Sequence, residues 1–174
     1  MKKILHCFIY FAVIGVIGFL FGRIVPSRWV DFEKIPYKCA DFEDNGEIYL
    51  KLHIKKWQNR VPDMSRIFPG LVPPKCMNRR KGKENILLML KETCVAELVH
   101  WLLCILGLGC FFILDGWYGL CLYLLYAGLG NLPFIMIQRY NRPRLRKILQ
   151  QFEGRKEECS VKRSLEYACF DSQL

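Results

Sequence analysis

The sequence lacks the cysteine spacings that would indicate a metal site or a disulfide framework. Its nine cysteines are odd in number, and no two are separated as C-x-x-C or C-x-C. Internal repeats and low-complexity tracts are also missing, and 174 residues are too few for a large multidomain enzyme. Because 52% of the residues are hydrophobic and 14% aromatic, a disordered chain is excluded as well. Four cysteines inside apolar blocks are expected to be small core residues: Cys7, Cys104, Cys110 and Cys121.

Acidic residues are scarce: Asp and Glu number 16 against 26 Lys and Arg, which gives a formal net charge of +10. These charges lie between apolar blocks instead of being spread along the chain. Such a pattern indicates anionic membrane surfaces or anionic small molecules as partners, ahead of nucleic acid. Nucleic acid is not expected, because the cations are tied to a bilayer surface and no base-reading element accompanies them.

Three long runs are almost free of charged side chains. They cover residues 4–22, about 96–114 and about 118–137. Each has about 19–20 residues, the length that crosses a hydrocarbon core of about 30 Å at 1.5 Å per residue. The rest of the chain is too small and polar to bury three such helices in a soluble protein. The predicted fold is therefore an all-α integral membrane protein with about three transmembrane helices.

The second and third runs are separated only by Asp115, Gly116 and Trp117, which predicts a tight antiparallel hairpin. For the first run a cleaved signal peptide is the alternative, but its length and the lack of a small-x-small cleavage site favour an uncleaved anchor. Residues 23–95 carry 15 Lys and Arg, and residues 138–174 carry 9. The positive-inside rule places both on the cytoplasmic side of a multi-pass cell-membrane protein, with the N-terminus and the Asp115 turn outside.

The charge pattern divides the chain into four parts. They are a membrane anchor (1–22), a basic interfacial segment (23–95), the hairpin with an Arg-rich exit (96–149) and a C-terminal tail (150–174). Within the second part, prolines limit helix length, and residues 47–54 fit either a short strand or an amphipathic interfacial helix. From Glu84 a helical pattern runs without a break into the second span.

Costly polar residues at membrane depth mark a candidate site. Glu97 and His100 lie one helical turn apart on one face of the second span. An ionisable group costs about 2.5–3.5 kcal/mol at the middle of a membrane helix, so it usually faces protein or water. Counting outward from Gly116 places His100 level with Asn131 and Pro133, and Pro133 locally opens its helix. The pattern predicts a polar pocket; the alternative is that Glu97 and His100 only snorkel or pin the helices together.

A metal site is not expected at this depth. Glu97 and His100 have no third ligand there, and a Glu-x-x-His di-iron site would need a second copy of the motif. The stretch that follows the third span reads Gln-Arg-Tyr-Asn-Arg-Pro-Arg-Leu-Arg-Lys over residues 138–147. A stop-transfer flank needs cations alone, whereas arginine forks among polar side chains suit bidentate phosphate binding. The expected phosphates are those of lipid headgroups or of an acyl thioester donor.

Several blocks resemble the glycosyl-4,4'-diaponeurosporenoate acyltransferase family. They are Glu92-Thr93, Ala96-Glu97-Leu98-Val99-His100-Trp101, Asn131-Leu132-Pro133 and Gln138-Arg139-Tyr140-Asn141-Arg142-Pro143-Arg144-Leu145, and Lys56-Trp57 with Pro62-Asp63 is similar to a further block. These blocks cover most of residues 50–149, whereas residues 64–83 and those beyond about Gln150 have no counterpart. The resemblance implies an acyltransferase that esterifies a hydroxyl of a lipid-linked glycoside, as in the last step of staphyloxanthin synthesis, a carotenoid pathway.

Acyl transfer to a hydroxyl needs a base, donors for the developing oxyanion and a grip on the donor. His100 is the expected base, with Glu97 holding its tautomer and Asn131 as a donor to the oxyanion or the acceptor. The expected donor-phosphate residues are Gln138, Arg139, Arg142 and Arg144. The expected acceptor and interface residues are Trp57, Trp101, Tyr140 and Asn141. No Ser or Cys lies level with His100, so direct attack by the acceptor is expected, with acyl-CoA or an acyl-carrier thioester as co-substrate and no other cofactor.

A non-enzymatic role is the alternative of a different class. A small membrane adaptor that binds anionic lipid or a partner protein explains the spans and the charges, but it leaves Glu97 and His100 with no role beyond helix packing. In either case the membrane lipid is a partner. A homo-oligomer that encloses its lipid substrate is a further expectation.

Overall fold

The computed structural model describes residues 2–26, 29–61 and 82–171, with side chains described as far as residue 154. Within these ranges every regular element is helical. The Pro62-Asp63 block, Cys76 and most of the basic run at 78–83 lie outside the described residues. The same holds for the side chains of Cys159 and Cys169 in the tail.

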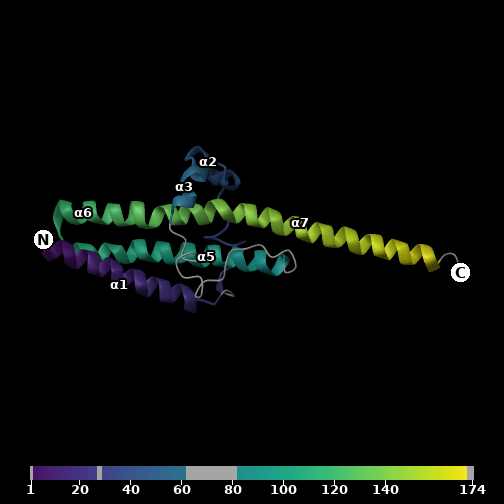
Figure 1. Ribbon diagram of the computed structural model, residues 1–174, viewed down its shortest axis with the longest axis horizontal. Coiled ribbons are helices and arrows are strands. Elements are labelled where there is room, and N and C mark those ends of the chain that lie inside the picture. The colour runs from purple at the N-terminus through teal and green to yellow at the C-terminus, as the bar shows by residue number, and fades with distance from the viewer. Residues whose placement is uncertain (1, 27–28, 62–81, 172–174) are drawn as a thin grey trace.

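Three long helical rods run side by side (Figure 1). The first is α1 (Lys2–Ile24), and the second is α5 (Gly82–Gly107), which the 3₁₀ turn η5 (Leu108–Phe112) extends. The third consists of α6 (Gly116–Leu125), the π-helical η6 (Tyr126–Asn131) and α7 (Leu132–Asp171). All three rods are long and apolar enough to cross a membrane, which confirms the predicted all-α class with three spans. α7 continues across residue 150, where the tail was expected to begin.

The outer surface of the rods carries large apolar side chains. Phe8, Val16 and Ile17 of α1 are 50–60% exposed, and Leu124 and Leu125 of α6 are each 56% exposed. A helix that is apolar on all sides belongs in the interior of a large protein or in a bilayer, and here its outer face is open. The exposed apolar surface is therefore the one that hydrocarbon would cover.

The predicted hairpin between the second and third rods is confirmed. Gly116 opens α6 with a φ of +69°, a left-handed conformation that glycine adopts at low cost. Lys3 Nζ lies 3.8 Å from Asp115 Oδ1. The N-terminus and the hairpin turn thus share one end of the bundle, as the topology requires, and Figure 1 shows them together.

α1 approaches α5 closely because small residues of α1 face α5. A Cβ added at Gly18 would lie 2.9 Å from Leu103 Cδ2, and one at Gly22 would lie 3.0 Å from Val99 Cγ2. Small residues let two membrane helices come close enough for extensive van der Waals contact. The core between these rods contains Cys7, Phe11, Ile14, Leu103 and Cys110. Cys7, Cys104 and Cys110 are buried as predicted, whereas Cys121 is half-buried.

The segment before α5 folds into short turns that lie on the side of α7 (Figure 1). These are η2 (Asp41–Gly46), α2 (Ile48–Lys51), α3 (Ile54–Trp57) and η3 (Gln58–Arg60). Of the two alternatives for residues 47–54, the helical one is confirmed. Tyr49 and Ile54 form a small core with Tyr140 of α7, which fixes this segment against the third rod.

Candidate active site

One buried face of the third rod, from Asn131 at the end of η6 along α7, carries both polar and apolar side chains. Asn131, Ile135, Arg142 and Leu149 are spaced by four or seven residues, and all are less than 10% exposed. This spacing keeps them on one side of the helix. Two polar clusters interrupt the otherwise apolar contact: an imidazole–amide pair formed by His100 and Asn131, and a charge network formed by Glu43, Glu97, Arg139 and Arg142.

The imidazole–amide pair joins the second and third rods. His100 Nδ1 lies 3.0 Å from Asn131 Oδ1, so the prediction that these residues are level is confirmed. Asn131 is 2% exposed, and its Nδ2 donates to the carbonyl of Tyr126 at 3.1 Å. The His100 ring also stacks on Phe134, with 4.6 Å between centroids and 13° between planes. Both the position and the plane of the imidazole are thereby set.

The orientation of the Asn131 amide indicates which nitrogen of His100 carries the proton. A π-helical turn is rare and occurs often at functional sites, and η6 ends at Asn131, two residues before Pro133. Since the Asn131 amide nitrogen donates to Tyr126, the amide oxygen faces the ring and accepts from Nδ1–H. In the neutral imidazole, Nε2 then carries the lone pair. The role of His100 as a base stays a prediction.

Glu97 does not hold His100, which corrects the expected role of this carboxylate. Glu97 is 1% exposed. Its Oε1 accepts from Arg139 Nη1 at 2.6 Å and from Trp101 Nε1 at 3.4 Å, and its Oε2 accepts from Arg142 Nη2 at 2.5 Å. Guanidinium groups form stronger, charge-assisted hydrogen bonds than a neutral imidazole one turn away. Asn131, and not Glu97, therefore orients the histidine.

Arg139 has all five of its N–H donors engaged. Its Nε and Nη2 donate to Glu43 at 2.5 and 2.8 Å, and its Nη1 donates to Glu97. The remaining donors reach the carbonyls of Pro36 at 3.2 Å and Lys38 at 3.5 Å. A guanidinium offers five N–H groups in total, so Arg139 has none left for a phosphate in this arrangement.

Arg142 is 5% exposed and occupied in a similar way. Its Nε donates to Thr93 Oγ1 at 3.1 Å, its Nη1 to the carbonyl of Tyr37 at 2.6 Å, and its Nη2 to Glu97 and to the carbonyl of Thr93. In place of the expected grip on donor phosphates, Arg139 and Arg142 tie α7 to α5 and to the segment before α5. Two carboxylates and two guanidiniums leave the charge network formally neutral, as a buried network requires.

Glu43 enters the network from η2, 96 residues before Arg139. Its Oε2 accepts from the Ala40 backbone N–H at 2.8 Å, the reach-back contact that a glutamate makes three residues into a capped turn. The Tyr49 hydroxyl donates to its Oε1. Burial alone would raise the pKa of Glu43, but the hydrogen bonds from Arg139, Tyr49 and Ala40 outweigh burial and lower the pKa to about 2. Burial and the hydrogen bond to Glu43 raise the pKa of Tyr49.

The other predicted site residues lie around these two clusters. Arg144 stacks on Tyr140, with its Cζ 3.4 Å from the ring centroid, and donates to the Tyr140 carbonyl at 2.6 Å. Trp57 packs against the Tyr140 core and donates to the Leu52 carbonyl, whereas Trp101 is 46% exposed on α5 and its Nε1 donates to Glu97. Gln138 and Asn141 are half-buried on α7. Of the expected acceptor and interface residues, Trp57 and Tyr140 are therefore brought together in one small core that does not include Trp101.

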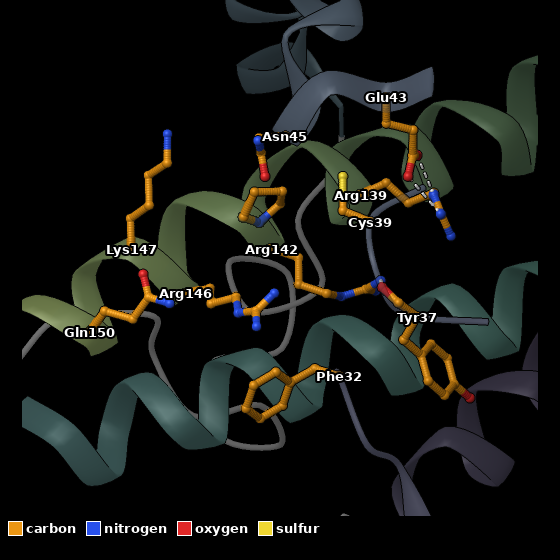
Figure 2. A pocket seen from close by; sticks show the side chains of 11 residues that line it. Phe32, Tyr37, Cys39, Glu43, Asn45, Arg139, Arg142, Arg146, Lys147 and Gln150 are labelled. Atoms are coloured by element: carbon orange, nitrogen blue, oxygen red, sulfur yellow. Dashed lines mark hydrogen bonds and ion pairs between the residues drawn. The ribbon is translucent and has the colours of Figure 1, made fainter. Parts of the chain in front are cut away.

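A cavity of about 120 Å³ opens beside the charge network, between α7 and the segment before α5 (Figure 2). Its lining combines side chains from that segment with a cationic stretch of α7: Phe32, Tyr37, Cys39, Glu43, Asn45, Arg139, Arg142, Pro143, Arg146, Lys147 and Gln150. Within the described ranges no group of three or more His, Cys, Asp or Glu is arranged to hold a metal ion. The absence of a metal and of a cofactor stays a prediction.

Four contributors to these sites were missed from the sequence: Glu43, Tyr49, Thr93 and Arg146. The available signal for Glu43 was the acidic stretch at 41–44 inside a segment rich in Lys and Arg. Thr93 lies within a block quoted for the family resemblance and Arg146 within the Arg-rich stretch. No periodicity connects η2 to α7, so the pairing of Glu43 with Arg139 was not predictable from the sequence.

Comparisons with known proteins give matches along most of the chain. The sequence profile of the glycosyl-4,4'-diaponeurosporenoate acyltransferase family matches residues 26–151. Proteins of that name from Staphylococcus aureus strains N315 and USA300 are 27% identical over 160 residues, which is 90% of this chain and 94% of theirs. The protein of that name from strain Newman is 26% identical over 153 residues, 86% of this chain and 90% of its own length. No solved structure matches the chain.

Proposed function

Since the chain belongs to the glycosyl-4,4'-diaponeurosporenoate acyltransferase family, we propose that it transfers a fatty acyl group from a thioester donor to a hydroxyl of a glycosylated lipid in the cell membrane. The chain is an acyltransferase, which sets aside the non-enzymatic adaptor. The relatives' name makes glycosyl-4,4'-diaponeurosporenoate the first acceptor to test, and with it a role in carotenoid biosynthesis. The observation that supports this chemistry is the imidazole–amide pair, in which Asn131 orients His100 within a membrane span.

In the proposed reaction His100 Nε2 takes the proton of the acceptor hydroxyl while the hydroxyl oxygen attacks the thioester carbonyl carbon. The new C–O bond forms, the tetrahedral intermediate collapses, and the C–S bond breaks. The proton then passes from His100 to the departing thiolate, so the products are an ester and a thiol. Asn131 acts through His100, because it holds Nδ1–H and stabilises the imidazolium that forms transiently.

The surroundings of His100 support an acceptor that arrives from the bilayer. His100 itself is half-buried, while the adjacent Trp101 and Leu132 are 46% and 40% exposed on the outer surface of the rods. A lipid-linked glycoside has an apolar body that hydrocarbon solvates and a sugar that stays at the interface. A half-buried base beside an exposed apolar surface suits such a substrate.

The charge network supports the geometry without entering the chemistry. Glu97 lies three residues before His100 on α5, and its two oxygens are held by Arg139 and Arg142 of α7. Reacting groups must be held close to their productive positions, because small displacements cost large factors in rate. The network fixes the two helices that carry His100 and Asn131 immediately beside the pair.

The test is an acyl-transfer assay in membranes that contain the chain. Glycosyl-4,4'-diaponeurosporenoate is supplied with either a palmitoyl-CoA or a palmitoyl carrier-protein donor, and lipid mass spectrometry measures the acylated product. We expect product with the unaltered chain and a loss of about 10²–10⁴-fold for His100→Ala, the usual contribution of a general base. Asn131→Leu should lower kcat and displace the pH profile of kcat, because the tautomer is no longer held.

His6→Ala is the matched control, since His6 is exposed on α1 and should leave the rate unchanged. Thermal unfolding of each variant separates lost chemistry from lost folding. Full transfer by a folded His100→Ala protein would disprove the assignment of the base, and no acylated product from any glycolipid would disprove the proposed acceptor class.

A further inference from the structure

The cavity beside the charge network is large enough for a phosphate group. Its volume of about 120 Å³ leaves room for several water molecules or for a phosphate with part of the molecule attached to it. The cavity lies beyond the apolar part of the third rod, at the end of the bundle away from Asp115.

Arg146 presents an unsatisfied donor at this cavity. Its Nε is buried and has no hydrogen-bond partner among the described residues, while its Nη2 donates to Glu33. Leaving a buried donor unpaired costs free energy, and an ionised donor costs more than a neutral one. In Figure 2 the Arg146 guanidinium extends from α7 toward Phe32, among the side chains that line the cavity, and the Arg146 side chain is 40% exposed. Its guanidinium can therefore donate to an acceptor in the cavity.

The charge balance indicates that this acceptor is anionic. Arg139 and Arg142 are compensated by Glu43 and Glu97, and the same hydrogen bonds satisfy them. Two further cations line the cavity, Arg146 and Lys147, and Glu33 offsets only one of them. Lys147 is exposed and follows Arg146 directly, so the two side chains leave α7 about 100° apart and flank the cavity.

We infer that this cavity binds the phosphate ester of the acyl donor, with the Arg146 guanidinium as the hydrogen-bond donor and Lys147 as the compensating charge. The inference rests on the proposed function and deepens it, because it names the donor class as a phosphopantetheine thioester. It also moves the phosphate site from the predicted Gln138, Arg139, Arg142 and Arg144 to Arg146 and Lys147, which line the cavity.

The separation from the imidazole–amide pair favours this donor class. Arg146 is 15 residues beyond Asn131, which is about 22 Å along a helix at 1.5 Å per residue. Fourteen bonds join phosphorus to the thioester carbon in a phosphopantetheine thioester, about 17 Å at the roughly 1.2 Å per bond of an extended chain. The length of the Arg146 side chain covers the remainder. An acyl phosphate would place its phosphate beside His100 instead.

Binding measurements test the site independently of turnover. The full chain is purified in a neutral maltoside detergent and titrated by calorimetry with 4'-phosphopantetheine and with pantetheine, which lacks the phosphate. We expect phosphopantetheine to bind at least tenfold more tightly. Arg146→Lys keeps the charge but removes the guanidinium fork, so this variant and Arg146→Gln should each weaken phosphopantetheine binding about 10–100-fold, with little effect on pantetheine. Lys51→Ala removes an exposed charge on α2 outside the cavity and should have no effect.

Equal binding of phosphopantetheine and pantetheine, or unchanged binding by a folded Arg146→Lys protein, would overturn the inference. Nanodiscs with phosphatidylglycerol in place of phosphatidylcholine distinguish a lipid headgroup as the source of the phosphate. If phosphatidylglycerol competes with phosphopantetheine and only the lipid loses affinity in Arg146→Gln, the site belongs to the headgroup and the inference fails. His100→Ala should bind phosphopantetheine as tightly as the unaltered chain does. If the unaltered chain binds phosphopantetheine but forms no acylated product, that result contradicts the proposed acyl transfer and leaves the inferred binding site standing.

Discussion

Replacing Glu97 by glutamine tests whether the charge network holds the bundle together. Glutamine keeps the size of the side chain but removes the charge that Arg139 and Arg142 share. Its single carbonyl oxygen serves one guanidinium well, and its amide N–H groups face the other. Because Glu97 is 1% exposed, water does not replace the lost carboxylate.

The expected loss of stability follows from this burial. Breaking a buried ion pair by removing one partner costs about 3–5 kcal/mol, since a buried charge is left uncompensated. At about 2–4 °C per kcal/mol for a chain of this size, the midpoint of thermal unfolding should fall by about 6–20 °C. Glu153→Gln is the matched control: it breaks the Lys83–Glu153 pair, whose side chains are 44% and 45% exposed, and should cost no more than about 1 kcal/mol.

Buried free cysteines supply the assay. Cys94 is 0% exposed and lies one turn before Glu97, and Cys7 and Cys110 are also 0% exposed. A thiol-reactive fluorogenic dye added to the detergent-solubilised protein should therefore report unfolding as these thiols become accessible. Combining Glu97→Gln with Arg142→Met should recover part of the loss, because one unpaired charge is removed. If Glu97→Gln and Glu153→Gln shift the midpoint equally, the network does not stabilise the bundle and this reasoning is refuted.

Two further predictions concern the helix contacts and the docking of η2. Gly18→Val should lower the thermal midpoint by the equivalent of about 1–3 kcal/mol, because the added Cβ would crowd Leu103. Gly15→Val is the control and should leave the midpoint unchanged, because a Cβ there would have no atom within 4 Å. Equal effects of the two substitutions would contradict the close packing of α1 on α5. For Glu43, a pKa lowered from 4.5 to about 2 means that the ionised carboxylate stabilises the fold fully above about pH 4.5, and that this contribution disappears as the pH falls toward 2. Tryptophan fluorescence followed against pH should show Trp57 released in that window, and Glu43→Gln should remove this step; a midpoint near neutral pH would contradict the prediction.

Much of the architecture follows from the sequence because its causes are local. An apolar run of about 20 residues specifies a span through its length and composition alone, whatever surrounds it. The short link at Asp115–Trp117 forces neighbouring spans to be antiparallel, and a rise of 1.5 Å per residue then sets which residues are level. This is why the contact between His100 and Asn131 was predictable across 31 residues.

The partners of the charged residues were decided only by the tertiary structure. Arg139, Arg142 and Glu97 were recognised as functional candidates, but the second carboxylate on Arg139 is Glu43, which the docking of η2 brings to a residue 96 positions away. That docking results from Tyr49 and Ile54 packing on Tyr140. No periodicity in the sequence predicts this contact between short turns and a long helix. A guanidinium has the same composition whether it holds a carboxylate or a phosphate. Which one it binds depends on whether a carboxylate is already within reach, and only the folded chain determines that.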